Sequence, residues 1–491
     1  MVSAALKYEP EEIKEIKDPI FLPSPVTYGS VSIAQMVENN HRFDASAYNI
    51  EAMNALHKVY KSKFGWGYLS GRNGLISDAF VGSRFKRIYT DNPLDIPFFL
   101  PSDIENIYPK AGKYISAKTN TDIDSLRVKQ NMLLVSVSGT IGKTSIVRKR
   151  LDGSVFSHDL LRVVFNNEFD LGFVYAFLNT DIGHTILQSN NYGAVIDHIE
   201  PEHLSRVPIP IAPESIKQEI HNLVIESFDL RDQSNDLIDK AQKLLYQELQ
   251  LPDINDIHPK YHSENAGFRN FTVKVSNLNW RLDASYHLPN INDVIELISK
   301  NAEEVTTVGD SRISNKIILA GVFKRHYVDS KFGVPFLGGR DMMQLNPKIE
   351  KYLSKELHKD RIKKELEVFE NYVLVSDRGT IGKVQIVPKH WNHWAVSQNV
   401  IKIIPKEGIA GYLYAYLSSD YALALIRREI YGSVVDMIDD NSVAVIPIPI
   451  LKNKHIQETI NDYVLQANEM RYQAYLKEQD AINKMNEILN N

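Results

Sequence analysis

The sequence predicts a mixed α/β (α+β) fold that occurs twice in tandem, with the two globular domains separated by two long helices. Three observations predict it: a colinear internal repeat, strand-like runs broken by turn residues in each copy, and two tails with the apolar spacing of paired helices. The length of 491 residues agrees, because a single hydrophobic core stops growing near roughly 250 to 300 residues.

Six segments carry the repeat and recur in the same order. The longest, LVSVSGTIGKTSIV at 134–147, returns as LVSDRGTIGKVQIV at 374–387 with ten of fourteen positions identical. The others pair 42–48 with 281–287, 85–91 with 323–329, 173–181 with 412–420, 192–199 with 431–438, and PIPI at 208–211 with 447–450. Such self-similarity predicts one structural unit used twice.

The repeat also predicts the domain boundaries. We expect an N-terminal extension at 1–27, a first globular domain at 28–211, a long helix at 212–250, a linker at 251–267, a second globular domain at 268–450 and a second long helix at 451–491. Within each copy, runs rich in Val, Ile and Phe such as MLLVSVSG, KTSIVRK and LLRVVF predict strands. The apolar spacing predicts helices over Ile50–Tyr60 and Phe173–Leu187.

The two tails have apolar or small residues at alternating steps of four and three, which is the seam of a helix that pairs with another helix. We therefore expect an antiparallel coiled coil of the two long helices. Every seventh seam residue is small, which lets the backbones approach closely. The expected helix–helix seam residues are Ser227, Ser234, Ala241, Ala467, Ala474 and Ala481.

Composition narrows the possible functions. The chain has no cysteine, which excludes disulfide scaffolds, thiolate zinc sites, iron–sulfur clusters and cysteine nucleophiles. No stretch approaches the roughly 20 apolar residues that span a bilayer, so we expect a cytoplasmic protein without a membrane partner. The net charge is −5, but residues 126–151 hold six bases and no acid, whereas 214–239 hold seven acids and two bases. Basic patches thus lie on an acidic frame.

The repeated GTIGK motif is a candidate phosphate contact. It is not a nucleotide-binding loop, because Val137 stands where that motif needs its first Gly. One interpretation is a turn between two strands whose backbone N–H groups and lysine face a DNA phosphate. The alternative is a tight hairpin with a solvated lysine. The candidate DNA-binding residues here are Thr140, Lys143, Arg378, Thr380 and Lys383.

The FKRxYxD motif places two cations beside aromatic residues, which suits nucleic acid because cations meet phosphates and Arg also reads guanine. Its candidate DNA-binding residues are Lys86, Arg87, Lys324 and Arg325. The alternative is an edge strand with its cations in solvent.

No catalytic centre is visible in the sequence. Asp44 and Asp283 are expected to cap helices rather than to act as catalytic carboxylates. His390 and His393 lack the companion Glu of a zinc-protease motif, so we expect no metal site. The chain also contains no Pro-Pro dipeptide, and therefore lacks the loop that amino-methyltransferases use on a flipped base. We expect a non-catalytic protein.

Over nearly its full length the sequence resembles the specificity subunit of type I restriction-modification systems. The resemblance rests on GTIGK after an apolar strand in each copy, on PFFLPSDI and VPFLGGRDM before it, and on the passage from YGxVxDxI through PIPI into IKQEI or HIQETI. The extended N-terminus and the acidic linker near 253–256 depart from the family pattern.

The resemblance implies two target-recognition domains that each read half of a split site on double-stranded DNA, and helices that set the spacing and dock DNA methyltransferase subunits. It implies no cofactor in this chain; S-adenosylmethionine, ATP and magnesium would belong to the partners, which include a translocating restriction subunit. Alternatives are a specificity partner of another phage-defence or type II modification enzyme, and a scaffold that binds protein or glycan.

Overall fold

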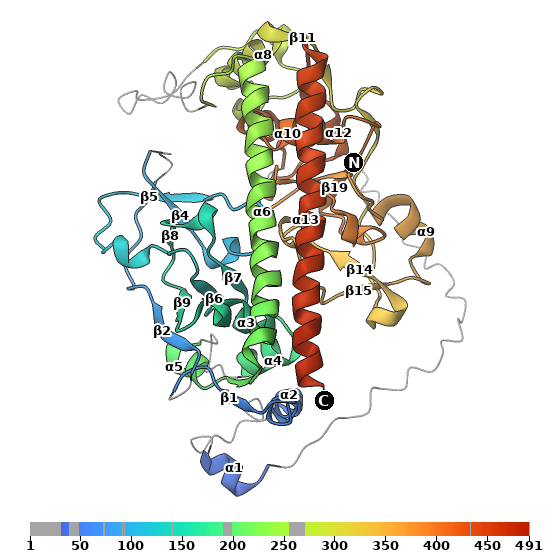
Figure 1. The fold of residues 1–491 in the computed structure, drawn as a ribbon. Helices are drawn as coiled ribbons and strands as arrows, with labels where there is room; N and C mark the ends of the chain where they lie inside the picture. Colours follow the sequence, from blue (N-terminus) through green and yellow to red (C-terminus); the bar gives the residue numbers. More distant parts are fainter. Residues whose placement is uncertain are drawn as a thin grey trace, which may run out of the picture.

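The computed structural model describes residues 31–38, 49–71, 74–90, 92, 94–138, 141–189, 199–254, 271–432 and 434–490. The expected N-terminal extension at 1–27, Asp44 and Thr140 lie outside the described residues. Two mixed α/β units lie beside a pair of long helices that run the length of the molecule (Figure 1). The predicted mixed α/β class is confirmed.

The first globular unit, called unit 1, comprises residues 49–211. Its helices are α2 (Ile50–Tyr60), α3 (Glu168–Leu178), α4 (Asp181–Ser189) and α5 (Pro201–Ser205), and α1 (Ile33–Glu38) precedes them. Its strands are β1 (Trp66–Tyr68), β2 (Ile76–Val81), β3 (Tyr89–Thr90), β4 (Ile96–Phe99), β5 (Lys113–Ile115), β6 (Leu133–Ser136), β7 (Thr144–Ile146), β8 (Val155–Phe156), β9 (Leu160–Phe165) and β10 (Pro208–Pro210).

The second globular unit, called unit 2, comprises residues 289–451. Its helices are α8 (Pro289–Asn301), α9 (Lys359–Arg361), α10 (Ala410–Leu417), α11 (Asp420–Arg428) and α12 (Asp440–Ala444). Its strands are β11 (Ala302–Thr307), β12 (Ser314–Ile318), β13 (Tyr327–Val328), β14 (Gly333–Leu337), β15 (Tyr352–Ser354), β16 (Val373–Ser376), β17 (Val384–Ile386), β18 (Ala395–Val396), β19 (Val400–Pro405) and β20 (Pro447–Leu451).

The two units repeat the same three sheets, which is the structural counterpart of the sequence repeat. Unit 1 has the strand orders β1-β10, β2-β9-β6-β7 and β3-β5-β4-β8. Unit 2 has β11-β20, β12-β19-β16-β17 and β13-β15-β14-β18. In both units the third sheet contains one parallel pair, β4 with β8 and β14 with β18. The PIPI strand lies in a two-stranded sheet in each copy. Both strands of such a sheet are edge strands, which tolerate proline because one side of the strand needs no backbone N–H donor.

The long helices are α6 (Glu214–Glu248) and α13 (Lys454–Leu489), and they run antiparallel. Three ion pairs set their direction: Glu219 with Lys484 at 2.7 Å, Glu226 with Lys477 at 2.6 Å, and Arg231 with Glu478 at 2.7 Å. From the first pair to the second, the partners advance seven residues along α6 and recede seven along α13. At about 1.5 Å per residue each helix is roughly 53 Å long.

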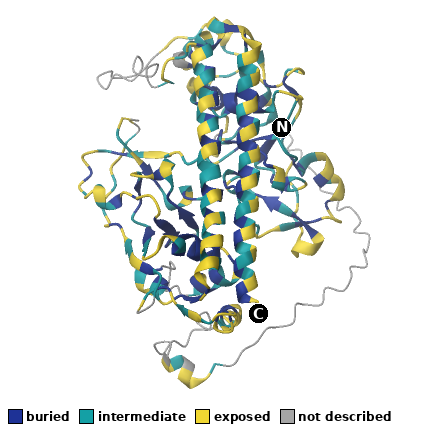
Figure 2. Ribbon diagram, in the orientation of Figure 1, coloured by how far each residue is buried: buried dark blue, intermediate teal, exposed yellow. Residues whose placement is uncertain are grey.

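Small residues line the contact between these helices. All six expected seam residues are fully buried, with 0% of the surface of Ser227, Ser234, Ala241, Ala467, Ala474 and Ala481 exposed. The hydroxyl of Ser227 donates to the backbone carbonyl of Ala474 at 2.7 Å, so the two backbones are close at this level. The other side of the helix pair stays exposed along its length (Figure 2).

We expect Ala474→Leu to lower the free energy of unfolding by about 1 to 3 kcal/mol, because a larger side chain at this closed contact forces strained rotamers or a backbone shift. Gln473→Leu is the matched control, since Gln473 is exposed one position away. Urea unfolding of both variants and the parent makes the comparison. Equal stability of Ala474→Leu and the parent would show that the helices have room to part here.

Each unit is anchored on both helices. The core of unit 1 includes Ile220 and Val224 from the first half of α6 and Met485 from the end of α13. The core of unit 2 includes Ile460 from the start of α13 and Leu245 from the end of α6. The units therefore lie toward opposite ends of the helix pair, offset along it (Figure 1).

One helix boundary differs from the sequence prediction. The helix expected over Phe173–Leu187 is two helices, α3 and α4, that break at Asn179 and Thr180. The Thr180 hydroxyl accepts from the N–H of Gly183 at 2.9 Å and caps α4. The chain turns sharply there, since a Cβ on Gly183 would lie 2.0 Å from the carbonyl oxygen of Phe177.

None of the helices in the described parts of the chain combines the length and the apolar character needed to cross a membrane.

Candidate nucleic-acid interface

The third sheet of each unit carries the FKRxYxD motif and exposes aromatic rings beside cations. The Tyr89 ring in β3 is 44% exposed, and the Lys113 ammonium in β5 lies 4.7 Å from its centroid. In unit 2 the Tyr327 ring in β13 is 40% exposed, with the Lys351 ammonium at 5.8 Å. The two pairs occupy equivalent places, because β3 pairs with β5 as β13 pairs with β15.

The motif arginines lie on the rings of the central strands. The Arg87 guanidinium is 5.6 Å from the Phe98 centroid in β4, and that of Arg325 is 5.5 Å from the Phe336 centroid in β14. Arg87 also forms an ion pair with Asp159 at 3.0 Å and is only 24% exposed. Arg87 therefore holds the sheet together, and its role in DNA binding stays a prediction.

The motif lysines are different: Lys86 and Lys324 are both exposed. Each precedes the exposed tyrosine of its unit, Tyr89 or Tyr327, by three residues, so each unit has two exposed lysines and an exposed tyrosine in or next to its third sheet. We call these equivalent surfaces the cation–aromatic faces, comprising Lys86, Tyr89 and Lys113 in unit 1 and Lys324, Tyr327 and Lys351 in unit 2.

Unit 2 has additional basic residues at the edge of its third sheet. Lys355, Lys359 and Lys363 are exposed around an open hollow of about 910 Å³, which Trp394 and His393 also line. Sequence reasoning missed this group, although the four-residue spacing of its lysines was a signal that they share one helical side.

In each unit, a buried cation on a strand of the second sheet donates hydrogen bonds to backbone carbonyls of neighbouring segments. Arg162 in β9 donates to backbone carbonyls of Leu126 at 2.9 Å and Phe156 at 3.1 Å, and burial lowers its pKa to about 10. The equivalent residue of β19, Lys402, donates to the carbonyl of Glu367 at 2.6 Å, and burial lowers its pKa to about 8. From the sequence, Arg162 is assigned only to a strand, in LLRVVF, and Lys402 has no predicted role.

The GTIGK segments form hairpin turns that use their own backbone donors. Gly142 has φ +86° and Gly382 has φ +82°, as the expected glycine-sharpened turn requires. The N–H of Gly142 donates to the Ser136 carbonyl and the N–H of Lys143 to the Ser136 hydroxyl, at 3.1 and 3.0 Å. Ser376 accepts in the same way in unit 2. These N–H groups are therefore engaged within the hairpin.

The GTIGK lysines are not solvated either. The Lys143 ammonium pairs with the carboxylate of Glu105, and only 20% and 25% of the two side chains is exposed. Lys383 is half-buried. Burial raises the pKa of Asp103 in unit 1, and the positive charge of Lys383 offsets part of that rise. Phosphate binding by these lysines stays a prediction, and would require breaking an existing contact of Lys143.

Removal of the Lys143 charge should destabilise the fold in a pH-dependent way. Burial raises the pKa of Glu105, and Lys143 opposes that shift. A carboxyl with a raised folded-state pKa stabilises the fold while protonated, and this contribution is lost as pH rises through the folded-state pKa. For Lys143→Met we therefore expect a loss of about 3 kcal/mol near pH 7.5 and a smaller loss near pH 5.

Urea unfolding at both pH values measures this difference. The control is the double variant Lys143→Met with Glu105→Met, which leaves no buried charge and places at 105 the residue that unit 2 has at 343. The double variant should recover most of the stability. A loss that is equal at both pH values and persists in the double variant would contradict the ion-pair explanation.

The other candidate residues of the second GTIGK turn, Arg378 and Thr380, have contacts within the protein. Arg378 pairs with its neighbour Asp377 at 2.8 Å, and Thr380 is exposed while its carbonyl accepts from the Ser376 hydroxyl at 2.6 Å. Contact of either residue with DNA stays a prediction.

Part of the basic stretch at 126–151 turns toward protein. Arg148 pairs with Asp229 of α6 at 2.8 Å, and Arg150 pairs with Asp239 of α6 at 2.8 Å. These arginines fasten unit 1 to the acidic helix, so part of the basic stretch contacts the acidic frame directly.

Two further expectations concern local chemistry. Asp283 does not cap the following turn. Its carboxylate pairs with Arg281 at 2.7 Å, and that hydrogen bond lowers the pKa of Asp283 to about 2.

His390 stacks on Tyr475 of α13 with ring centroids 4.0 Å apart, and His393 lies 2.8 Å from a carboxylate oxygen of Glu367. Within the described residues, no group of three or more His, Asp or Glu side chains has the arrangement of a metal site.

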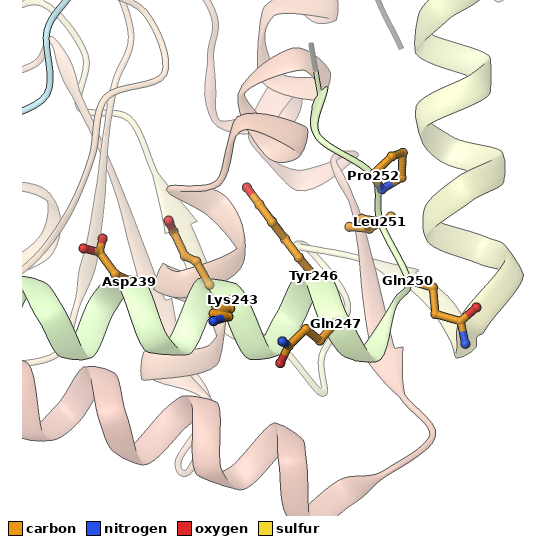
Figure 3. A pocket seen from close by; sticks show the side chains of 8 residues that line it. Asp239, Lys243, Tyr246, Gln247, Gln250, Leu251 and Pro252 are labelled. Carbon is orange, nitrogen blue, oxygen red and sulfur yellow. The ribbon is translucent and has the colours of Figure 1, made fainter. Parts of the chain in front are cut away.

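An open hollow of about 670 Å³ lies along the end of α6 (Figure 3). Asp239, Lys243 and Tyr246 line it from one side of the helix, and Leu251 and Pro252 from the segment that follows. The Asp239 carboxylate accepts a hydrogen bond from the Arg150 guanidinium at 2.8 Å. The Tyr246 hydroxyl accepts from the N–H of Asp420 at 3.3 Å. Its polar groups thus connect α6 to the two units.

The structure therefore consists of two equivalent α/β units with matching cation–aromatic faces, held on one antiparallel helix pair. Residues 329–470 match the family model of the type I restriction modification DNA specificity domain. The match covers most of unit 2 and the first half of α13, so this part of the chain is similar to that specificity domain.

The solved structures that match this chain include the S subunit of a type I restriction-modification system from M. genitalium, at 13% identity and TM-score 0.33, covering 87% of this chain and 96% of that one. Another is the HsdS subunit from Thermoanaerobacter tengcongensis, at 14% identity and TM-score 0.25, covering 86% and 98%. No curated protein matches the chain in sequence.

Proposed function

We propose that each unit reads one half of a bipartite site on double-stranded DNA through its cation–aromatic face. The observation that carries the proposal is the equivalence of the two faces, each with an exposed tyrosine and two exposed lysines on the third sheet. Lysines supply phosphate contacts that fix position, and side chains around them read base edges. Two related modules on one chain suit a site with two separated halves.

The helix pair would separate the two modules. Its length of roughly 53 Å exceeds the roughly 34 Å of one turn of B-DNA, so two units anchored toward opposite ends can face neighbouring turns. The exposed side of α6 and α13, opposite the units, is the surface that we assign to methyltransferase subunits (Figure 2). In this proposal the partners carry catalysis with S-adenosylmethionine, ATP and magnesium, and include the translocating restriction subunit.

The test is methylation mapping of a host genome with and without this chain and its methyltransferase partner. We expect one bipartite motif to lose methylation when the chain is absent. Exchange of residues 49–211 for the same segment of a relative with a different motif should change one half-site only. Loss of both half-sites in a chain that still assembles would contradict the assignment of one half-site to each unit.

A further inference from the structure

We propose that a direct contact between the two units, and not the helix pair alone, fixes the separation and orientation of the two DNA half-sites. The contact, called the inter-unit bridge, comprises Asn106 and Ile107 of unit 1 with Met343, Gln344 and Leu345 of unit 2. Asn106 and Gln344 form an antiparallel β-bridge, and the N–H of Ile107 donates to the carbonyl of Met343 at 2.7 Å. The link to DNA spacing rests on the proposed function.

The bridge joins the same segment of each repeat. Phe98 of β4 pairs with β8 as Phe336 of β14 pairs with β18, which makes positions 98 and 336 equivalent. Counting eight residues on from each gives Asn106 and Gln344, the two residues that pair. Each copy thus meets its own counterpart, as at a local two-fold axis.

The bridge is enclosed by both helices. Ile107, Leu345 and Ala474 of α13 form one buried cluster, with 3%, 2% and 0% of their surfaces exposed. The side-chain amide of Asn235 in α6 donates to the Ile107 carbonyl at 2.9 Å. His390 Nε2 lies 2.9 Å from the Leu345 carbonyl oxygen. Both units and both helices therefore meet at the middle of the molecule, where water does not compete for these backbone bonds.

Reciprocal charges flank the bridge. Lys110, four residues after Asn106, pairs with Asp420 at the start of α11 at 2.7 Å. The equivalent Lys348 lies near Asp181 at the start of α4: burial lowers the pKa of Lys348, and Asp181 opposes that shift. Lys110 of unit 1 thus contacts a carboxylate at a helix N-terminus of unit 2, and Lys348 of unit 2 lies in the field of the equivalent carboxylate of unit 1.

These contacts restrain a motion that the helices alone would permit. Two long helices can bend and slide slightly along their seam, and the units would then move relative to each other. A paired backbone at the centre, with an ion pair of Lys110 and Asp420 on one side and the opposite charges of Lys348 and Asp181 on the other, opposes both sliding and rotation. A spacer-sensitive DNA reader needs that restraint, because one base pair changes both the distance and the angle between half-sites.

The absence of cysteine allows a direct measurement on the full chain. Asp78→Cys in β2 and Lys316→Cys in β12 place spin labels at equivalent exposed sites outside the cation–aromatic faces. Ile107→Pro removes the N–H that crosses the bridge, and Ile107→Val keeps it. As a milder pair, Lys110→Glu with Lys348→Glu reverses the flanking charges, and Asp420→Lys with Asp181→Lys should rescue them.

We expect a narrow label distance distribution in the parent and in Ile107→Val, and a broader one in Ile107→Pro and in the charge-reversed chain. In the unlabelled complex, preference for the parental gap over a gap one base pair longer should fall about tenfold, the size of coupling common within one contact network. Unchanged distances and gap preference in folded bridge variants would overturn the proposal. A parent complex that binds no bipartite site would refute the proposed function, while the label distances would still decide whether the bridge restrains the units.

Discussion

Replacing Lys86, Lys113, Lys324 and Lys351 by glutamine should lower the DNA affinity of the assembled complex by roughly 10³-fold or more near 0.1 M salt. Each phosphate contact contributes about 0.9 to the slope of log affinity against log salt, so loss of four contacts should lower that slope by about 3.6. All four lysines are exposed, and two of them lie on the tyrosine rings of the cation–aromatic faces.

Fluorescence anisotropy between about 50 and 200 mM salt measures the slope, because several phosphate contacts together change affinity by orders of magnitude over that range. The charge-matched control is Lys240→Gln with Lys243→Gln, two exposed lysines of α6. The unit 1 pair and the unit 2 pair should each account for about half of the change. A quadruple variant with the parental slope would show that DNA does not lie on these faces.

The duplicated fold was predictable because its signals are local. Strand β9 and helix α2 have the bounds that the sequence predicts, and the seam residues follow from a periodic pattern along each helix. The break at Asn179 was missed because the apolar spacing continues through it, and only the capping role of Thr180 reveals the turn.

The candidate site was less predictable, because it depends on partners far apart in the sequence. GTIGK was correctly expected to form glycine-dependent turns, yet no pattern indicated that Glu105 would take the lysine of the first copy, since unit 2 has Met at the equivalent position. The pairing of Arg150 with Asp239 shows the same limit: opposite charge runs were visible, and their contact was not. The inter-unit bridge joins residues 238 positions apart without any periodic signal.

Lengthening the helix pair should change the gap between half-sites and open the inter-unit bridge. One seam-compatible heptad inserted after Ser234 and another after Ala474 keep the 3.5-residue phase and lengthen the pair by about 10 Å. The insertion points lie between the main anchors of the two units, Val224 of α6 with unit 1 and Leu245 of α6 with unit 2. At about 3.4 Å per base pair the preferred gap should grow by roughly three base pairs, with a rotation of about 100° between the half-sites.

Several contacts cannot survive such a displacement. The hydrogen bond of Asn235 to the Ile107 carbonyl at 2.9 Å and the ion pair of Arg150 with Asp239 at 2.8 Å both cross the insertion point, and so does the packing of Ala474 on Ile107. We therefore expect weaker DNA binding as well as the longer gap. Methylation mapping should find the two parental half-sites, because the cation–aromatic faces are unchanged.

The bridge makes this experiment more discriminating, because the lengthened chain should already have lost the contact that Ile107→Pro removes. Adding Ile107→Pro to the insertion should then change gap preference and affinity by less than about twofold, although the same substitution in the parent has a large effect; such non-additivity is the signature of one shared interaction. A lengthened, active chain that keeps the parental gap would show that the helices do not set the spacing. Full additivity of the two changes would show that the bridge and the helix pair restrain the units independently.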